Sequence, residues 1–232
     1  MTIDVKPVSP ARLVATALML LVWPGALLAL GGDARWAEGW IFAAWFVTLF
    51  STVIGWLYRN DPALLAERYR KSDDGQRGWD RVVVPALFLG YVAWLVAMPL
   101  DARRFHWTHA WPAASRLVGG VLLVPSFVLF FRSFTDNTYL SPLVRIQAER
   151  KQHVVSTGVY GFVRHPMYLG AVLMFVGVPL LLGSVVGLAI GAGLSLLLAA
   201  RIVGEERMLA TELEGYEGYR ARVRYRLLPG VW

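Results

Sequence analysis

The sequence contains no cysteine, and this absence excludes disulfides, thiolate nucleophiles and cysteine-ligated metals. Only four histidines occur, and none stands in a His-Glu-x-x-His or comparable ligand spacing. We therefore expect no metal site. Charged residues make up only 17% of the chain, and no Gly-x-Gly-x-x-Gly motif is present, so nothing indicates a soluble dinucleotide-binding domain.

Apolar residues dominate instead: 56% of the chain is hydrophobic, and the mean hydropathy is +0.50. Six apolar runs are present, at Leu13–Leu30, Trp40–Tyr58, Val82–Leu100, Leu117–Phe131, Met167–Leu182 and Ser184–Ile202. A spanning helix needs about 20 residues, so the fourth and fifth runs are short. Gly183 alone separates the last two runs, which predicts a tight helical hairpin. We predict an all-α integral membrane protein with about six transmembrane helices.

Nothing in the sequence marks an internal repeat or a second domain, so residues 1–232 are expected to form a single membrane-embedded domain. Within it, residues 1–133 hold the first four spans. Residues 134–232 contain the polar motifs and are expected to form the cofactor-binding catalytic half.

The formal charge of +7 has a simple explanation in a membrane protein. With six spans both termini lie on one side, and all Lys and Arg residues except Arg35, Arg103, Arg104 and Arg116 fall on that side. The positive-inside rule then places both termini in the cytoplasm; in a bacterium, the membrane spanned would be the inner membrane. Basic loops facing anionic lipid account for the charge better than nucleic-acid binding does.

Residues 60–70 are predicted to form a short helix on the membrane surface, with Asp61 as its N-cap. Leu64 and Leu65 would dip into lipid while its arginines stay in water. The long connection at residues 135–158 lies on the side of the termini, and connections of this length are more often functional than idle.

A polar cluster opens the fifth run: Arg164, His165 and Tyr168 lie together at the expected membrane surface. Pro166 suits a first helical turn, and the start of a helix attracts anions. A carboxylate or phosphate would rest there, with Arg164 adding a fork of donors. The rings of His165, Tyr160 and Tyr168 would stack on a planar base. Alternatively, Arg164 only reaches lipid phosphates. As a cluster, however, these residues favour function.

A second cluster follows the sixth run. Arg201 and Glu205 are four residues apart and share a helix face, which suits a simple surface ion pair. Two adjacent carboxylates beside an arginine are also well placed to hold a cationic ligand. Glu206 points about 100° away from Glu205, so the two carboxylates need not share one task.

The run from Thr157 to Gly170, with its Arg-His-Pro-Met-Tyr core, resembles the signature of the isoprenylcysteine carboxyl methyltransferase family, which is grouped with the phospholipid N-methyltransferases. The tail agrees: it contains Arg201-x-x-x-Glu-Glu, then Tyr216-x-x-Tyr, then Arg226-Leu-Leu-Pro. Asn137 and Val144-Arg-Ile-Gln resemble the segment that precedes the signature in bacterial members. The resemblance covers the C-terminal part of the chain only.

This resemblance implies an S-adenosylmethionine-dependent methyltransferase with a helical membrane fold and a cofactor pocket at the cytoplasmic face. The implied cofactor-binding residues are Gln147, Val154, Val155, Tyr160, Arg164, His165, Pro166, Tyr168, Leu169, Gly170, Glu205 and Glu206. It further implies that Arg201 and Glu205 act in catalysis. Arg201 would orient an anionic acceptor, and Glu205 would hold Arg201.

The first candidate reaction is carboxyl O-methylation of a lipophilic, isoprenylcysteine-like acceptor in the membrane. A carboxylate acceptor is already ionised, so alignment and dehydration suffice and neither a strong base nor a metal is required. Phosphatidylethanolamine N-methylation is the alternative, and its amine must lose a proton to a base. A different class, an NADPH-dependent membrane reductase of the sterol-reductase type, shares the Arg-His-Pro-x-Tyr element. A transporter is disfavoured because the spans lack charged midplane residues. Apart from the acceptor, membrane lipids are the partners expected, and the oligomeric state is left open.

Overall fold

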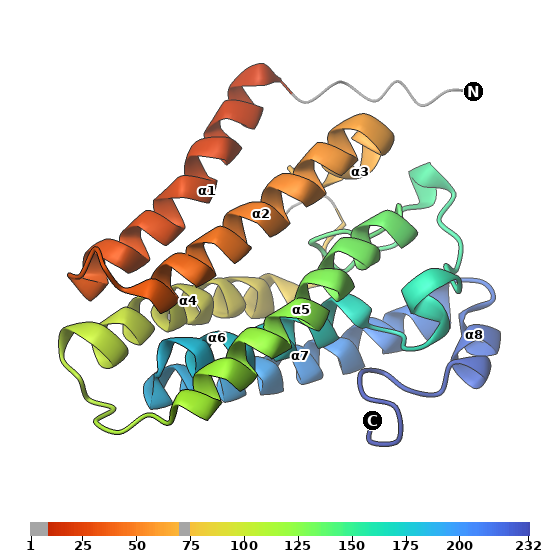
Figure 1. Ribbon diagram of the computed structural model, residues 1–232. Helices are drawn as coiled ribbons and strands as arrows, with labels where there is room; N and C mark the ends of the chain where they lie inside the picture. Colours follow the sequence, from red (N-terminus) through yellow and green to blue (C-terminus); the bar gives the residue numbers. More distant parts are fainter. Residues whose placement is uncertain (1–8, 70–74) are drawn as a thin grey trace.

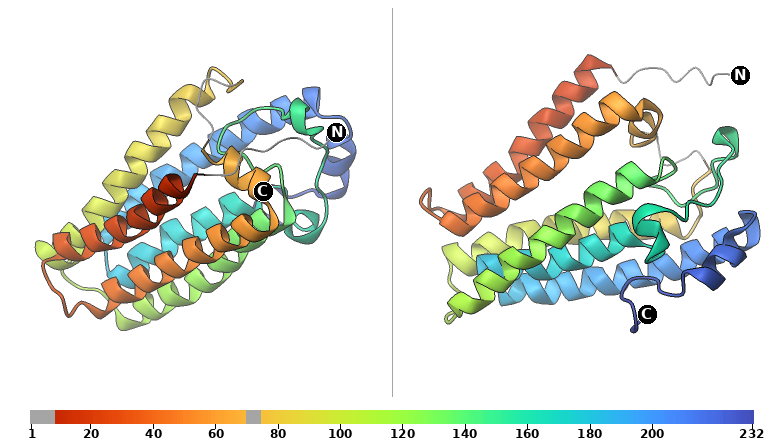
Figure 2. Two further views of the ribbon diagram at one scale, coloured as in Figure 1. Left: turned by 90° about the horizontal axis from the view of Figure 1, so that it is seen from above. Right: turned by 45° about the vertical axis from the view of Figure 1, so that its right-hand side comes forward.

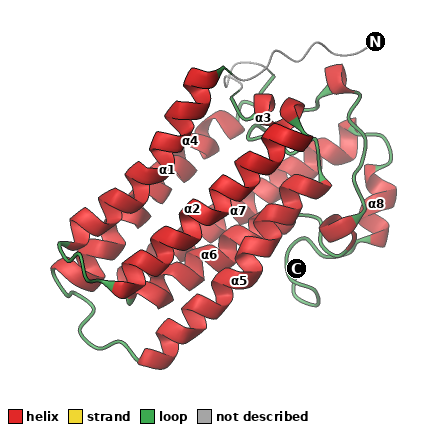
Figure 3. Ribbon diagram, turned by 45° about the horizontal axis from the view of Figure 1, so that its top comes forward, coloured by secondary structure: helices red, strands yellow, loops and turns green. Residues whose placement is uncertain are grey.

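The computed structural model describes residues 9–69 and 75–232, and in this part regular structure is entirely helical (Figure 3). The long helices run side by side as a bundle (Figures 1 and 2). They are α1 (Pro10–Gly31), α2 (Ala37–Asn60), α4 (Asp80–Pro99), α5 (Ala113–Asp136), α6 (Pro166–Leu182) and α7 (Val185–Glu212). Shorter helices are α3 (Pro62–Glu67), η1 (Leu100–Arg104), η2 (Ala148–Arg150), η3 (Gly158–Gly161) and α8 (Tyr216–Arg222).

The predicted all-α membrane fold is confirmed. Five helices are long and apolar enough to cross a membrane, and α6 is a shorter apolar helix of 17 residues. The fourth run was expected to be short, but α5 has 24 residues. The helix extends past the apolar stretch at both ends. The more polar segments Ala113–Arg116 and Arg132–Asp136 are helical too.

The predicted hairpin of α6 and α7 is also confirmed. Gly183 ends α6 in the left-handed conformation with φ +84°, where a side chain would be strained. Ser184 then caps α7 by accepting a hydrogen bond from the Gly187 amide at 2.8 Å. Asp101 of η1 is fully buried beside this turn. It holds the hairpin by accepting a bond from Ser184 Oγ at 2.6 Å.

Helices α5 and α6 approach each other closely because small residues face each other. A Cβ added at Gly119 would lie 2.3 Å from the Leu181 backbone nitrogen, so only glycine fits there. Two turns further along the same face of α5, Ser126 Oγ donates to the Gly170 carbonyl at 2.8 Å. Close backbone approach of this kind substitutes for the hydrophobic effect between helices in lipid.

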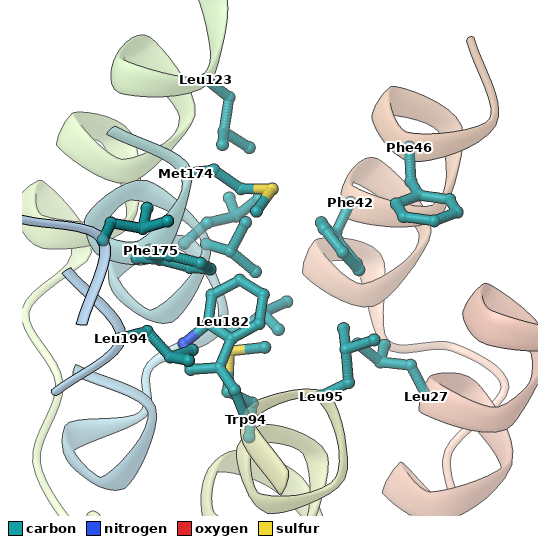
Figure 4. Close-up of a cluster of buried hydrophobic side chains, with 14 of the residues drawn as sticks. Leu27, Phe42, Phe46, Trp94, Leu95, Leu123, Met174, Phe175, Leu182 and Leu194 are labelled. Atoms are coloured by element: carbon teal, nitrogen blue, oxygen red, sulfur yellow. The ribbon is translucent and has the colours of Figure 1, made fainter. Parts of the chain in front are cut away.

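A cluster of large apolar side chains joins α1 and α2 to the remaining helices (Figure 4). Trp94 is fully buried at its centre, and its indole donates to the Gly187 carbonyl at 3.0 Å. Phe175 meets this indole edge-on, with ring centroids 5.4 Å apart. The core therefore fixes α4 against α6 and α7, the helices that carry the polar motifs.

The short helix α3 differs from the expectation that Leu64 and Leu65 dip into lipid. Both are buried among protein side chains that include Leu57 and Phe134. The capping prediction is confirmed, since Asp61 Oδ1 accepts from the Leu64 amide at 2.9 Å. The helix packs against α2, where Leu64 and Leu65 join Leu57 in one apolar cluster. The last arginine of the predicted segment, Arg70, and the first residues of the turn after it lie outside the described residues.

We predict that Gly119→Ala destabilises the protein by about 1–3 kcal/mol or more, because the new methyl group meets the α6 backbone. Thermal unfolding in detergent measures this effect. Gly120→Ala is the matched control, since a Cβ there meets nothing within 4 Å. Equal melting temperatures for the two variants would contradict the close packing of α5 and α6.

Candidate functional site

A cavity opens at the end of the bundle where α6 begins and α7 ends. It encloses about 830 Å³, counting its open mouth. Its walls come from the α5–α6 connection, the start of α6, the last turns of α7 and α8. The lining residues are Asn137, Tyr139, Leu140, Ser141, Leu143, Val144, Arg145, Gln152, His153, Val154, Val155, Tyr160, Arg164, His165, Pro166, Met167, Tyr168, Glu205, Met208, Leu209, Leu213, Tyr216 and Tyr219.

The structure brings together most of the residues expected in a cofactor pocket: Val154, Val155, Tyr160, Arg164, His165, Pro166, Tyr168 and Glu205 all line the cavity. Leu169 and Gly170 do not line it, because successive residues of a helix point about 100° apart. Gly170 faces α5 instead. Gln147 is fully buried behind the wall, where its side-chain amide donates to the Tyr139 carbonyl at 2.6 Å.

Glu206 does not line the cavity either, although it was expected to hold the cofactor. It is 3% exposed and accepts from Arg164 Nε at 2.6 Å and from Arg226 Nε at 2.7 Å. His165 Nε2 lies 3.2 Å from the same carboxylate. Glu206 therefore joins the start of α6, the end of α7 and the C-terminal tail.

The Arg164 guanidinium is engaged within the protein as well. Besides Glu206, it donates to the carbonyls of Val223 and Arg224, both at 2.7 Å. The Arg164 amide donates to the Tyr225 carbonyl at 3.0 Å. Arg164 thus lines the cavity and also anchors the C-terminal tail. Its guanidinium donors, which were expected to bind an anion, are directed to Glu206 and to the carbonyls of the tail.

Arg201 pairs with a residue that sequence analysis missed. Its Nε donates to Asp80 Oδ1 at 2.8 Å, and another guanidinium nitrogen donates to the Pro142 carbonyl at 2.7 Å. The expected partner, Glu205, receives none of these bonds. Asp80 lies 121 positions away on α4, so no spacing rule pointed to it.

Glu205 and Tyr168 form the polar centre of the cavity wall. The Tyr168 hydroxyl donates to Glu205 Oε2 at 2.9 Å and accepts from an Arg201 guanidinium nitrogen at 3.0 Å. Among the described residues no arginine, lysine or histidine pairs with Glu205, which is only half-buried. Its carboxylate is therefore available to a cation in the cavity.

Tyrosines supply much of the remaining wall: Tyr139, Tyr160, Tyr168, Tyr216 and Tyr219. Burial raises the pKa of the Tyr160, Tyr216 and Tyr219 hydroxyls above the ordinary value for tyrosine. These phenols stay neutral at physiological pH. His165 stacks on Tyr168 with ring centroids 5.6 Å apart. Ring faces beside a carboxylate form a favourable environment for an organic cation.

Carboxylates of the N-terminal half hold the long connection that forms one cavity wall. Thr138 Oγ1 donates to Asp61, the Arg145 guanidinium donates to Glu67 at 2.9 Å, and the Val144 amide donates to Asp80 at 3.0 Å. The length of this connection indicated a function, but nothing in the sequence identified its anchors. Tyr139 and His153 were not predicted at the site either; their hydrogen-bonded pair, 3.0 Å apart, lines the cavity.

A second cavity of about 880 Å³, again counting its opening, lies within the bundle. Its walls are apolar apart from two hydroxyls, and they come from α1, α2, α4, α5 and α6. The lining residues are Thr16, Met19, Leu20, Trp23, Phe46, Leu49, Phe50, Ile54, Tyr91, Phe130 and Met174. Met174 lies six residues beyond Tyr168 on α6, which corresponds to about 9 Å along the helix. The two cavities therefore follow one helix from the membrane edge inward.

We predict that replacing the two adjacent carboxylates affects stability to different extents. Glu206→Gln is expected to destabilise the protein by about 3–5 kcal/mol, because it leaves buried Arg164 without its counter-charge. Glu205→Gln is expected to leave the melting temperature nearly unchanged, since glutamine still accepts from Tyr168. Thermal unfolding in detergent compares them, and equal destabilisation would show that the assignment of the two faces is wrong.

Comparison with known proteins bears on this geometry. Residues 114–214 match the family model described as phospholipid methyltransferase. No curated protein sequence matches the chain significantly. Among solved structures, a similar fold is that of a eukaryotic intramembrane Ras methyltransferase, isoprenylcysteine carboxyl methyltransferase, solved without a monobody. The two chains have a TM-score of 0.59 and 18% identity over 94% of this chain and 75% of that one.

The matched region covers α5 to the end of α7 and so includes the start of α6, Tyr168 and Glu205. The fold likeness extends over nearly the whole chain. These two findings confirm the family resemblance seen in the sequence motif. The chain is an integral, multi-pass membrane protein whose residues 114–214 resemble the phospholipid methyltransferase family and whose fold resembles that of the Ras methyltransferase.

Proposed function

We propose that the protein transfers a methyl group from S-adenosylmethionine to a lipophilic acceptor in the membrane, and that carboxyl O-methylation of an isoprenylcysteine-like acid is the first candidate reaction. One observation carries the proposal. Glu205 presents a carboxylate without a basic partner in the described residues to a tyrosine-lined cavity at the end of the bundle.

The residues present fit this cofactor. When bound, S-adenosylmethionine supplies an activated methyl group on a positively charged sulfur. Glu205 and the tyrosine rings would hold its cationic groups. Its carboxylate suits the start of α6, where Pro166 stands at the first position and no side chain caps the helix.

The chain's own groups then align the reactants and exclude water. A carboxylate acceptor is already ionised and needs no base. Methyl transfer to it therefore requires no catalytic triad among the residues that line the cavity. Arg201 has its guanidinium bound to Asp80 and Tyr168. We therefore assign it the task of positioning the Tyr168 hydroxyl, rather than that of binding the acceptor directly.

The second cavity supports a lipophilic acceptor. It lies within the membrane-spanning part of the bundle, and apart from two hydroxyls its walls are hydrocarbon and aromatic. A hydrocarbon chain buried there would gain about 25 cal/mol for each Å² of apolar surface removed from water. Both cavities lie along α6. The hydrocarbon chain of the acceptor would therefore extend into the bundle from a reacting group held near Tyr168.

Phospholipid N-methylation is the second candidate, favoured by the description of the matching family model. An ammonium headgroup must lose a proton before it attacks, and the Glu205–Tyr168 pair offers an acceptor for it. Methylated phosphatidylethanolamine in the lipids of expressing cells would decide for this reaction.

We also propose that both termini lie in the cytoplasm. Arg103 and Arg116, which belong to the sparse basic side, pair with Asp33 and Glu38 at the end of the bundle away from α8. Arginines are plentiful at the cavity end. The charge asymmetry supports a cavity that opens to the cytoplasm, where the cofactor is available.

We predict saturable binding of S-adenosylmethionine and S-adenosylhomocysteine in calorimetric titration of the detergent-purified protein. Glu205→Gln is expected to weaken it by about tenfold or more, as for loss of a charge-assisted contact. Glu217→Gln is the control, because this exposed residue pairs only with Arg220 in the described structure. Binding of NADPH in place of both ligands would overturn the proposal in favour of a reductase.

We further predict that Leu20→Trp raises the KM for a lipid acceptor by about tenfold, because the larger ring fills the second cavity and displaces apolar contact. Cofactor affinity should stay unchanged. Leu18→Trp on the same helix is the matched control, since Leu18 is 58% exposed and faces away from the cavity. Equal KM values for the two variants would show that the acceptor chain binds elsewhere.

A further inference from the structure

Asp80 is a fully buried carboxylate that does not line the cavity. It begins α4 and accepts four hydrogen bonds. They come from the Gln76 side-chain amide at 2.9 Å, the Val144 amide at 3.0 Å, and two guanidinium nitrogens of Arg201 at 2.8 and 3.4 Å. No motif pointed to this residue, and the N-terminal half supplies it to a site formed mainly by the C-terminal half.

From Asp80 a chain of contacts leads to the cavity through Arg201 and Tyr168 to Glu205. Arginine has donors only, so the Tyr168 hydroxyl must accept the bond from Arg201. Its single proton is then directed to Glu205. Asp80 thus fixes the donor direction of a hydroxyl that it does not touch.

Arg201 has an alternative partner close by. Glu205 follows it by four residues on the same helix, the spacing at which arginine and glutamate side chains pair directly. In the structure Arg201 turns to Asp80 instead, and its remaining donors reach Pro142 and Tyr168. Glu205 is left with the Tyr168 hydroxyl and the cavity.

We propose that Asp80 is a positioning residue: by holding Arg201 it prevents the direct Arg201–Glu205 pair and keeps the Glu205 carboxylate free for the cationic cofactor. The inference rests on the proposed function, since it assigns the cofactor to Glu205. Beyond that function, we infer that the carboxylates of Asp80 and Glu205 compete for the Arg201 guanidinium. Loss of Asp80 lets Arg201 neutralise Glu205 and blocks the cation site from within.

The test compares Asp80→Asn with wild type by calorimetric titration with S-adenosylmethionine, together with kcat and KM. Cofactor affinity should fall about tenfold or more. Asp101→Asn is the matched control. Asp101 is equally buried, accepts a similar set of bonds from Thr108, Ser184 and Val186, and lies at the far end of the bundle. It should lose thermal stability while its affinity and kcat remain near wild type.

A double variant separates positioning from folding. If Asp80 acts through Arg201, then Asp80→Asn in an Arg201→Gln background has no further effect on cofactor affinity. Asp80→Asn/Arg201→Gln should also bind better than Asp80→Asn alone, because no cation remains to capture Glu205. Asp80→Glu should retain most of the wild-type affinity. Should Asp80→Asn not fold, a loss of affinity from Arg201→Gln to Asp80→Asn/Arg201→Gln would still overturn the inference.

Wild-type affinity in Asp80→Asn, or a further loss in the double variant, would overturn the inference. Failure of wild type to bind the cofactor would instead overturn the proposed function. A solved structure of Asp80→Asn tests the competition without any ligand: we expect the Arg201 guanidinium within about 4 Å of Glu205. A guanidinium that stays in its present place would contradict it.

Discussion

Charge neutralisation near the membrane surface governs how the cavity end of this protein is built. Glu67, Asp80 and Glu206 are buried, and each pairs with an arginine: Arg145, Arg201 and Arg164 respectively. A buried carboxylate without such a partner would be strongly destabilising. These pairs engage the arginines nearest the cavity, and among the described residues Glu205 has no such ion pair. The cation site proposed at Glu205 therefore depends on ion pairs formed by its neighbours.

The same pairs show that the two halves of the chain are not independent. The division into four N-terminal spans and a catalytic C-terminal half describes where the motifs lie in sequence. In the structure, Asp61, Glu67 and Asp80 hold the connection that forms one cavity wall. Residues without any recognisable motif thereby determine the shape of the site.

Much of the fold could be predicted from the sequence because membrane spans and helical hairpins are local properties. Apolar length marks a span, and Gly183 marks the turn between two of them. The motif at the start of α6 also identified most of the cavity's central residues. Helix boundaries were less predictable: α5 continues through polar residues that hydropathy alone assigns to loops.

The pairing of charges could not be predicted, for two physical reasons. Spacing along a helix identifies neighbours on one face, as it did for Arg201 and Glu205, but it gives no access to a partner on another helix such as Asp80. Glu205 and Glu206 are adjacent in sequence, and which of them faces the cavity depends on the rotation of α7 within the bundle. That rotation is set by packing contacts far from either residue, among them Gly191 against Phe175.

The shortness of α6 has a consequence for the bilayer. Seventeen residues extend about 26 Å, less than the roughly 30 Å of a typical hydrocarbon core. With its hairpin end held by Asp101 and Ser184, the other end of α6 falls short of the headgroup region unless the membrane thins around it. Tyr168, in the first turn of α6, shares this recessed position. For the function proposed above, a lipid acceptor would meet a water-soluble cofactor there without being lifted out of its leaflet, and bilayer thickness would become a determinant of that encounter.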